Sequence, residues 1–98
     1  MAILTEFEWD DVKATKNEQK HNVSFEYASR VFLDPQRLAG KDTRKKYGES
    51  RFLVLGTIEG RLFAVAYTQR KNGITRIISA RKANRREQKK YNAIHAQS

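Results

Sequence analysis

The sequence predicts an α+β fold in which an N-terminal strand and two helices precede an antiparallel β-meander and a C-terminal helix. Helix-like and strand-like patterns are segregated along the chain, which is typical of this class. Two near-continuous apolar runs flank Glu59-Gly60, and an Asn-Gly pair follows the second run at 72–73; both dipeptides favour hairpins. The chain of 98 residues has the length of one domain, so we expect residues 1–98 to form a single domain.

The first third of the chain contains one strand pattern and two helix patterns. Over Ile3–Trp9 aromatic residues and glutamates occupy alternate positions, as in a half-buried strand. Asp10 then provides an N-cap for a helix that runs to about Lys20 and has few apolar residues. Ser24 caps a second helix, which the proline at position 35 ends. Apolar residues recur at helical spacing in this second helix, at Phe25, Ala28, Val31 and Phe32.

The rest of the chain has the pattern of a meander followed by a helix. Strands are expected at Arg51–Ile58, Arg61–Tyr67 and Ile74–Arg81, with a short edge strand before them at 37–39. Because the first two of these runs are almost continuously apolar, we expect the centre of the sheet to be buried on both faces. The last helix should span Asn84–His95, with Asn84 as N-cap and Glu87 in the capping-box position.

Charge is distributed unevenly along the chain. The net charge is +9, but residues 1–36 carry −3 and residues 37–98 carry +12. Such an asymmetry favours a nucleic acid or an acidic protein as the partner, although a solvated surface that only aids solubility is the alternative. Basic residues gather in the segment 36–50, where lysines could instead discourage strand pairing at an edge, and around the start of the last helix. The candidates for RNA binding are Arg44, Lys45, Lys46, Lys82, Arg85 and Arg86.

The composition excludes several kinds of site. The chain has no cysteine, which rules out disulfides and thiolate metal sites, and its two histidines are far apart in sequence. We therefore expect no metal and no other cofactor. No apolar run approaches the roughly 18 residues of a membrane span, and the N-terminus lacks the basic start of a signal peptide. A cytoplasmic protein without membrane association is expected.

No standard catalytic motif is present, but the residues permit RNA cleavage. The 2′-hydroxyl of RNA can attack the adjacent phosphate, so the protein need not supply a nucleophile. It must orient the strand, move two protons and stabilise negative charge on the phosphate. Arginine suits the last task because its guanidinium is always charged and can bind two phosphate oxygens. Since DNA lacks the 2′-hydroxyl, this mechanism is specific for RNA.

Six residues are candidates for that chemistry. Arg81 ranks first, because it ends a strand where a side chain can face a groove; a plain surface ion pair is the alternative. Arg76 either faces a polar groove or pairs with a carboxylate such as Glu49, since an unpaired charge among apolar residues is costly. Arg51 opens the strongest strand close to Glu49, which places a carboxylate within reach of two arginines.

Tyr67 and His21 complete the set. Tyr67 ends its strand and could stack on a base or carry a proton; its alternative is a tyrosine at the edge of the core. His21 is a proton carrier on the functional interpretation and a loop or cap histidine on the structural one.

The opening Phe7-Glu8-Trp9-Asp10 and the segment Ile77–Ala83 are the most specific parts of a pattern that covers about residues 7–91. In this pattern the chain resembles the BrnT toxin family. Asn22 and Asn84 are mild departures, because Gly and a small hydroxyl residue are usual there. Further matching positions are Lys13, Asn17, Lys20-His21, Val23-Ser24-Phe25, Val31-Phe32, Asp34-Pro35, Asp42, Gly48-Glu49, Arg51, Gly56–Tyr67, Arg85-Arg86-Glu87 and Tyr91.

The resemblance implies a function that spacing alone does not reveal. BrnT proteins are toxins of type II toxin–antitoxin pairs with a RelE/ParE-like fold, and they act as ribonucleases that arrest translation and growth. An endoribonuclease that works without a metal is therefore expected. The implied partners are RNA and a BrnA-like antitoxin that binds the toxin directly, with operator DNA bound only through the complex. Two alternatives remain: a basic binding module without catalysis, and a ParE-like gyrase poison on the same fold.

Overall fold

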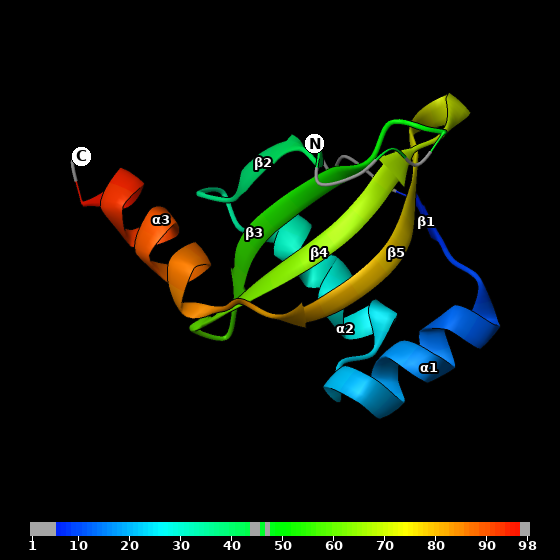
Figure 1. Cartoon of the computed structure of the whole chain (residues 1–98), viewed down its shortest axis with the longest axis horizontal. Helices are drawn as coiled ribbons and strands as arrows, with labels where there is room; N and C mark the ends of the chain where they lie inside the picture. Colours follow the sequence, from blue (N-terminus) through cyan, green and yellow to red (C-terminus); the bar gives the residue numbers. More distant parts are fainter. Residues whose placement is uncertain (1–5, 44–45, 47, 97–98) are drawn as a thin grey trace.

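The structure is a computed structural model that describes residues 6–43, 46 and 48–96. A single five-stranded sheet with the strand order β1-β5-β4-β3-β2 forms its centre. Figure 1 shows α1 and α2 grouped on one side of the molecule, with α3 well separated from them. The predicted α+β class, with an N-terminal strand, two helices, a meander and a last helix, is confirmed.

Among the described residues, the N-terminal strand gives the sheet its one parallel pairing. Strand β1 (Glu6–Glu8) pairs with β5 so that Glu8 lies beside Arg76. The sheet is therefore mixed: the strands of the meander pair antiparallel, as predicted, while β1 pairs parallel to β5. Two α-helices, two 3₁₀ helices and three strands separate β1 from β5, and a connection of that length allows two strands to lie side by side in the same direction.

Helices α1 and α2 begin where their caps predict. Helix α1 (Asp11–His21) starts at Asp10, whose side chain accepts hydrogen bonds from two backbone N–H groups of the first turn. Helix α2 (Phe25–Ala28) starts at Ser24 and continues as the 3₁₀ helix η1 (Ser29–Leu33). The second predicted helix thus exists, with its second half wound more tightly.

The sheet face that carries these helices holds the main core. Gly56 lets η1 approach β3 closely, because a Cβ at that position would lie 2.8 Å from the backbone oxygen of Val31. The residues that form the centre of this core are each at most 2% exposed and come from α2, η1 and three strands: Phe25, Val31, Val54, Val65 and Ile77.

The meander follows the predicted strands closely. Glu59 and Gly60 both have positive φ, as a tight two-residue hairpin turn requires. Within the β4–β5 pairing, Ala66 lies beside Ser79 but Tyr67 lies beside Ile77, so one residue of β5 bulges out. The elements are β2 (Leu38–Lys41), β3 (Phe52–Ile58), β4 (Arg61–Gln69), the 3₁₀ helix η2 (Lys71–Gly73) and β5 (Ile74–Lys82).

Helix α3 (Arg85–His95) covers part of the second sheet face. Its Tyr91 packs with Leu55 and Ala64, which point away from the main core and form a second, smaller cluster. The expectation that the centre of the sheet is buried on both faces is confirmed for β4, in which residues 63–68 are all buried. We call the part of this second face that α3 does not cover the open face. None of the helices in the described ranges has the length and apolar character needed to span a bilayer.

Candidate functional site

A bulge brings two arginines of β5 to the open face. Arg76 lies beside Thr68 of β4, and Arg81 lies beside Ala64, so both point to the same side as these β4 residues. An odd separation of five residues would put them on opposite faces of a regular strand. The extra residue in the bulge cancels this alternation. Their β4 neighbours are four residues apart, so the arginines are spaced by roughly 13 Å along the sheet.

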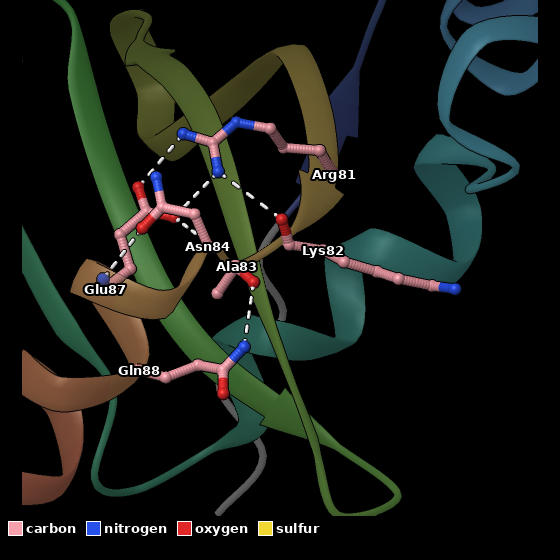
Figure 2. A network of polar contacts seen from close by, with 6 residues as sticks. All are labelled: Arg81, Lys82, Ala83, Asn84, Glu87 and Gln88. Carbon is pink, nitrogen blue, oxygen red and sulfur yellow. Dashed lines mark hydrogen bonds and ion pairs between the residues drawn. The ribbon is translucent and has the colours of Figure 1, made fainter.

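The guanidinium of Arg81 is held by a carboxylate at the start of α3. Nη1 donates to Glu87 Oε1 at 2.7 Å and Nη2 donates to Oε2 at 3.0 Å, which is the two-point geometry of strong ion pairs. Nη1 also donates to the backbone oxygen of Lys82 at 3.4 Å. Figure 2 shows the guanidinium facing Glu87 while the side chain of Lys82 extends away from them.

Arg76 has a different carboxylate from the one the sequence suggested. Its Nη1 donates to Glu8 Oε2 at 2.7 Å, and Arg70 Nε lies 3.6 Å from the same oxygen. The suggested partner, Glu49, does not make this contact, because the parallel pairing of β1 with β5 puts Glu8 directly beside Arg76. Of the two alternatives for Arg76, the ion pair with a carboxylate is the one observed, and its partner is Glu8.

Arg51 and Glu49 form a third pair just before β3. Arg51 Nε donates to Glu49 Oε2 at 2.9 Å, beside an open pocket of about 470 Å³ that Lys46 also lines. The hydroxyl of Thr68 donates to the backbone oxygen of Ser50, so this pair lies at the Arg76 end of the sheet. Arg51 and Glu49 therefore lie close together, as predicted, but away from Arg81.

Tyr67 points to the opposite side of the sheet from Arg81. Its ring packs edge-on against Phe32 and stacks on Phe52, with centroid distances of 5.1 and 5.6 Å, and the residue is 7% exposed. Burial raises the pKa of the Tyr67 phenol, although the charge of Arg37 opposes this effect. Tyr67 is therefore a tyrosine at the edge of the core, the structural alternative, because strand alternation turns Ala66 to the second face and Tyr67 to the main core.

His21 ends α1 near the Arg81 end of β5. One turn earlier, Asn17 uses its amide to bind both backbone groups of Ala80, at 2.9 and 3.1 Å. A third bond joins the same amide to the backbone oxygen of Val23. Because residues four apart share a helix face, His21 lies on the side of α1 that faces this part of the sheet. Its side chain is half-buried.

The residues expected to bind RNA are only partly described by the structure. Lys46 and Lys82 are exposed, and so are Arg85 and Arg86, which form the first turn of α3. Lys82 points to the helix-bearing side and lines a groove with Arg61. Arg44 and Lys45 lie outside the described residues.

A buried carboxylate that sequence reasoning left without a structural role fixes α3 to the sheet. Asp34 accepts hydrogen bonds from the Tyr91 hydroxyl at 2.6 Å, from the backbone N–H and hydroxyl of Thr57 at 2.8 and 3.0 Å, and from Gln36. Burial raises the pKa of Asp34, but these bonds, led by that of Tyr91, outweigh it and hold the pKa below its ordinary value. Burial and the bond to Asp34 raise the pKa of Tyr91. Asp34 and Tyr91 are 57 positions apart, so no local pattern in the sequence links them. Both residues appear only among the positions that match the family.

Comparison with known proteins identifies a family. The family model described as the ribonuclease toxin BrnT of type II toxin–antitoxin systems matches residues 9–87. The chain is similar in structure to the ribonuclease toxin BrnT of Brucella abortus, with a TM-score of 0.63 and 23% sequence identity. That match covers 84% of this chain and 100% of the other. A search of curated proteins finds no match.

Proposed function

Because the chain belongs to the BrnT family, the ribonuclease toxins of type II toxin–antitoxin systems, we propose that it cleaves RNA on the open face of its sheet, with Arg81 binding the reacting phosphate. The observation that carries this proposal is the position of Arg81: its guanidinium is fixed by Glu87 at a partly exposed site on that face, beside the exposed arginines of α3. A fixed cation of this kind is suited to charge that develops on a phosphate.

The reaction proposed is the attack of a 2′-hydroxyl on the adjacent phosphate. The new oxygen–phosphorus bond forms as the bond to the 5′-oxygen of the next nucleotide breaks, leaving a cyclic phosphate and a free 5′-hydroxyl. Arg81 stabilises the extra negative charge on the phosphate oxygens without a metal, as in RelE-like enzymes. His21 is kept in this proposal as the carrier of one proton, because α1 packs on β5 beside Ala80 and imidazole is the commonest general acid–base group. Tyr67 has no part in this step because it lies in the core.

The other pairs on the sheet are proposed to guide the strand. Arg76 with Glu8, and Arg51 with Glu49, lie at the end of the sheet away from Arg81. They serve in this proposal as contacts for neighbouring phosphates, together with Lys46, Arg85 and Arg86, and with Arg44 and Lys45 outside the described residues. Lys82, on the helix-bearing side, is proposed to contact a part of the RNA that extends beyond the open face. Such contacts position the backbone and carry no sequence preference.

The partner proposed for this toxin is a BrnA-like antitoxin acting in the cytoplasm, where the RNA substrate is found. The net charge of +9 suits an acidic docking segment on that antitoxin. Operator DNA is proposed to be bound only by the complex, through the antitoxin.

The test combines growth with cleavage of RNA by the purified protein. Expression alone should arrest growth, and Arg81→Ala should relieve the arrest at equal protein level. A random pool of single-stranded RNA should be cut to products with cyclic phosphate ends, while the same pool made as DNA should stay intact. RNA that is bound but not cut would support a binding module without catalysis. The observation that favours this second function is the pairing of all three candidate arginines with carboxylates. Cleavage of DNA, or full activity of Arg81→Ala, would overturn the site proposed here.

A further inference from the structure

The contacts of Arg81 divide its guanidinium into an occupied edge and a free edge. The terminal edge, formed by Nη1 and Nη2, carries the two-point contact with Glu87. The second hydrogen of Nη1 is directed to the backbone oxygen of Lys82. Of the five donors of an arginine, the Nε–H and one Nη2–H remain, and they lie side by side along the other edge. Neither has a partner within the part of the chain that the structure describes.

Two hydrogen bonds with Asn84 hold Glu87 in place at the start of α3. Its Oε1 accepts a hydrogen bond from the backbone N–H of Asn84 at 2.9 Å, and its own N–H donates to the side chain of Asn84 at 2.8 Å. This capping box fixes the carboxylate relative to the start of α3, as Figure 2 shows. Tyr91, farther along α3, is anchored to Asp34. Only 13% of the Glu87 side chain is exposed, so its carboxylate is a rigid support for the guanidinium.

We propose that Glu87 is the positioning residue of the cleavage reaction: it binds the terminal edge of Arg81 so that the Nε–Nη2 edge takes two oxygens of the reacting phosphate. This inference rests on the proposed function. The geometry of a guanidinium permits two such parallel contacts on different edges at once. A lysine in place of Arg81 could not make both.

The negative charge of Glu87 beside the proposed phosphate site should affect the binding of RNA and the orientation of Arg81 in opposite ways. The negative charge of Glu87 lies next to the site of a phosphate and therefore weakens the attraction of RNA to that site. Its benefit is orientation, which acts on the chemical step and not on the initial encounter. Removing the charge should lower kcat while leaving KM unchanged or reduced. A residue that merely stabilised the fold would not produce this split.

The variant Glu87→Gln isolates the ion pair from the helix cap. Glutamine serves in a capping box as glutamate does, so the start of α3 should persist while the charged contact with Arg81 is lost. We expect kcat for an RNA oligonucleotide, chosen from the cleaved pool, to fall by about 10²-fold, because small misplacements of reacting groups cost that much. KM should stay constant or decrease. A kcat equal to that of the unmodified protein would overturn the inference.

The matched control is Asn84→Ala, which removes the side-chain acceptor of the cap but keeps the backbone N–H that binds Glu87 Oε1 and the carboxylate–guanidinium contact. It should lower the melting temperature, because the helix loses its cap, without the loss of kcat. If Asn84→Ala reduces kcat as strongly as Glu87→Gln, helix stability and not the ion pair is responsible, and the inference fails.

A double-variant cycle tests whether Glu87 acts through Arg81. The double variant Arg81→Ala/Glu87→Gln should be no less active than Arg81→Ala alone, because the support has no function without the guanidinium. Additive losses would overturn the inference. If Glu87→Gln fails to fold, Arg81→Lys provides the test, because lysine cannot bind Glu87 and a phosphate through two edges. We expect a similar loss of kcat, and full activity of Arg81→Lys would overturn the inference. Full activity of Arg81→Ala refutes the proposed site itself, whereas an inactive Arg81→Ala with a normal Glu87→Gln refutes only the role of Glu87.

Discussion

Tyr91→Phe should destabilise the protein by removing the hydroxyl that binds Asp34. The bond is 2.6 Å long, and both residues are at most 8% exposed, so water cannot readily replace the donor. Phenylalanine retains the packing of the ring on Leu55 and Ala64. The change therefore isolates one hydrogen bond to a buried carboxylate, which is worth about 1.5–3 kcal/mol. For a domain of this length that loss lowers the melting temperature by roughly 6–24 °C.

The stabilisation that the Tyr91–Asp34 hydrogen bond provides should depend on pH, because both groups can ionise. The bond contributes to keeping the pKa of Asp34 below its ordinary value of 3.8. The stabilisation is therefore present above that value and is lost as the pH falls through the lower pKa of the folded protein. The pKa of Tyr91 is raised above 10.0, so its contribution is present below that value and is lost as the pH rises through the folded pKa.

Thermal unfolding of both proteins, followed by circular dichroism from pH 2 to 11, measures the effect. The gap between the two melting temperatures should be greatest and constant at intermediate pH and should narrow at both extremes. A gap that is independent of pH would show that the hydroxyl does not act through the carboxylate. Equal melting temperatures at pH 7 would refute the reasoning altogether.

Two further variants test the packing of the helices on the sheet. Asn17→Ala should reduce the free energy of unfolding in urea by about 2–3 kcal/mol, because the buried backbone groups of Ala80 lose their partners; a change below 0.5 kcal/mol would contradict this role. Gly56→Ala should cost about 1–3 kcal/mol in the same assay, since the new Cβ meets Val31 at 2.8 Å. Gly40→Ala, where a Cβ meets nothing within 4 Å, is the matched control and should be nearly neutral, so equal losses at both positions would contradict the packing argument.

Features fixed by local chemistry could be predicted from the sequence. Asp10 and Ser24 cap helices because their side chains accept hydrogen bonds from residues two or three positions ahead, and the Glu59-Gly60 turn depends on two adjacent backbone conformations. These contacts need no knowledge of the rest of the fold. The same holds for the capping box that positions Glu87, although its contact with the strand residue Arg81 was not predicted.

Features fixed by distant contacts could not be predicted in this way. The partner of Arg76 depends on which strand lies beside β5, and 68 positions separate it from Glu8. The bulge that places Arg76 and Arg81 on one face leaves no recognisable mark in the alternation of β5, so the sequence alone would have separated them. Asn17 resembled its solvated neighbours, and only the fold reveals that its amide is buried against Ala80.

The amide of Asn17 also covers part of the edge of β5 that no strand occupies in the described residues. Strand β1 covers only the first three residues of β5, and an uncovered strand edge recruits other chains. By binding both backbone groups of Ala80, a single helical side chain takes the place that a neighbouring strand would occupy. At the β1 margin the described residues offer three positions, two of them glutamates, which oppose pairing. The amide of Asn17 thus protects this part of the β5 edge from pairing with another strand.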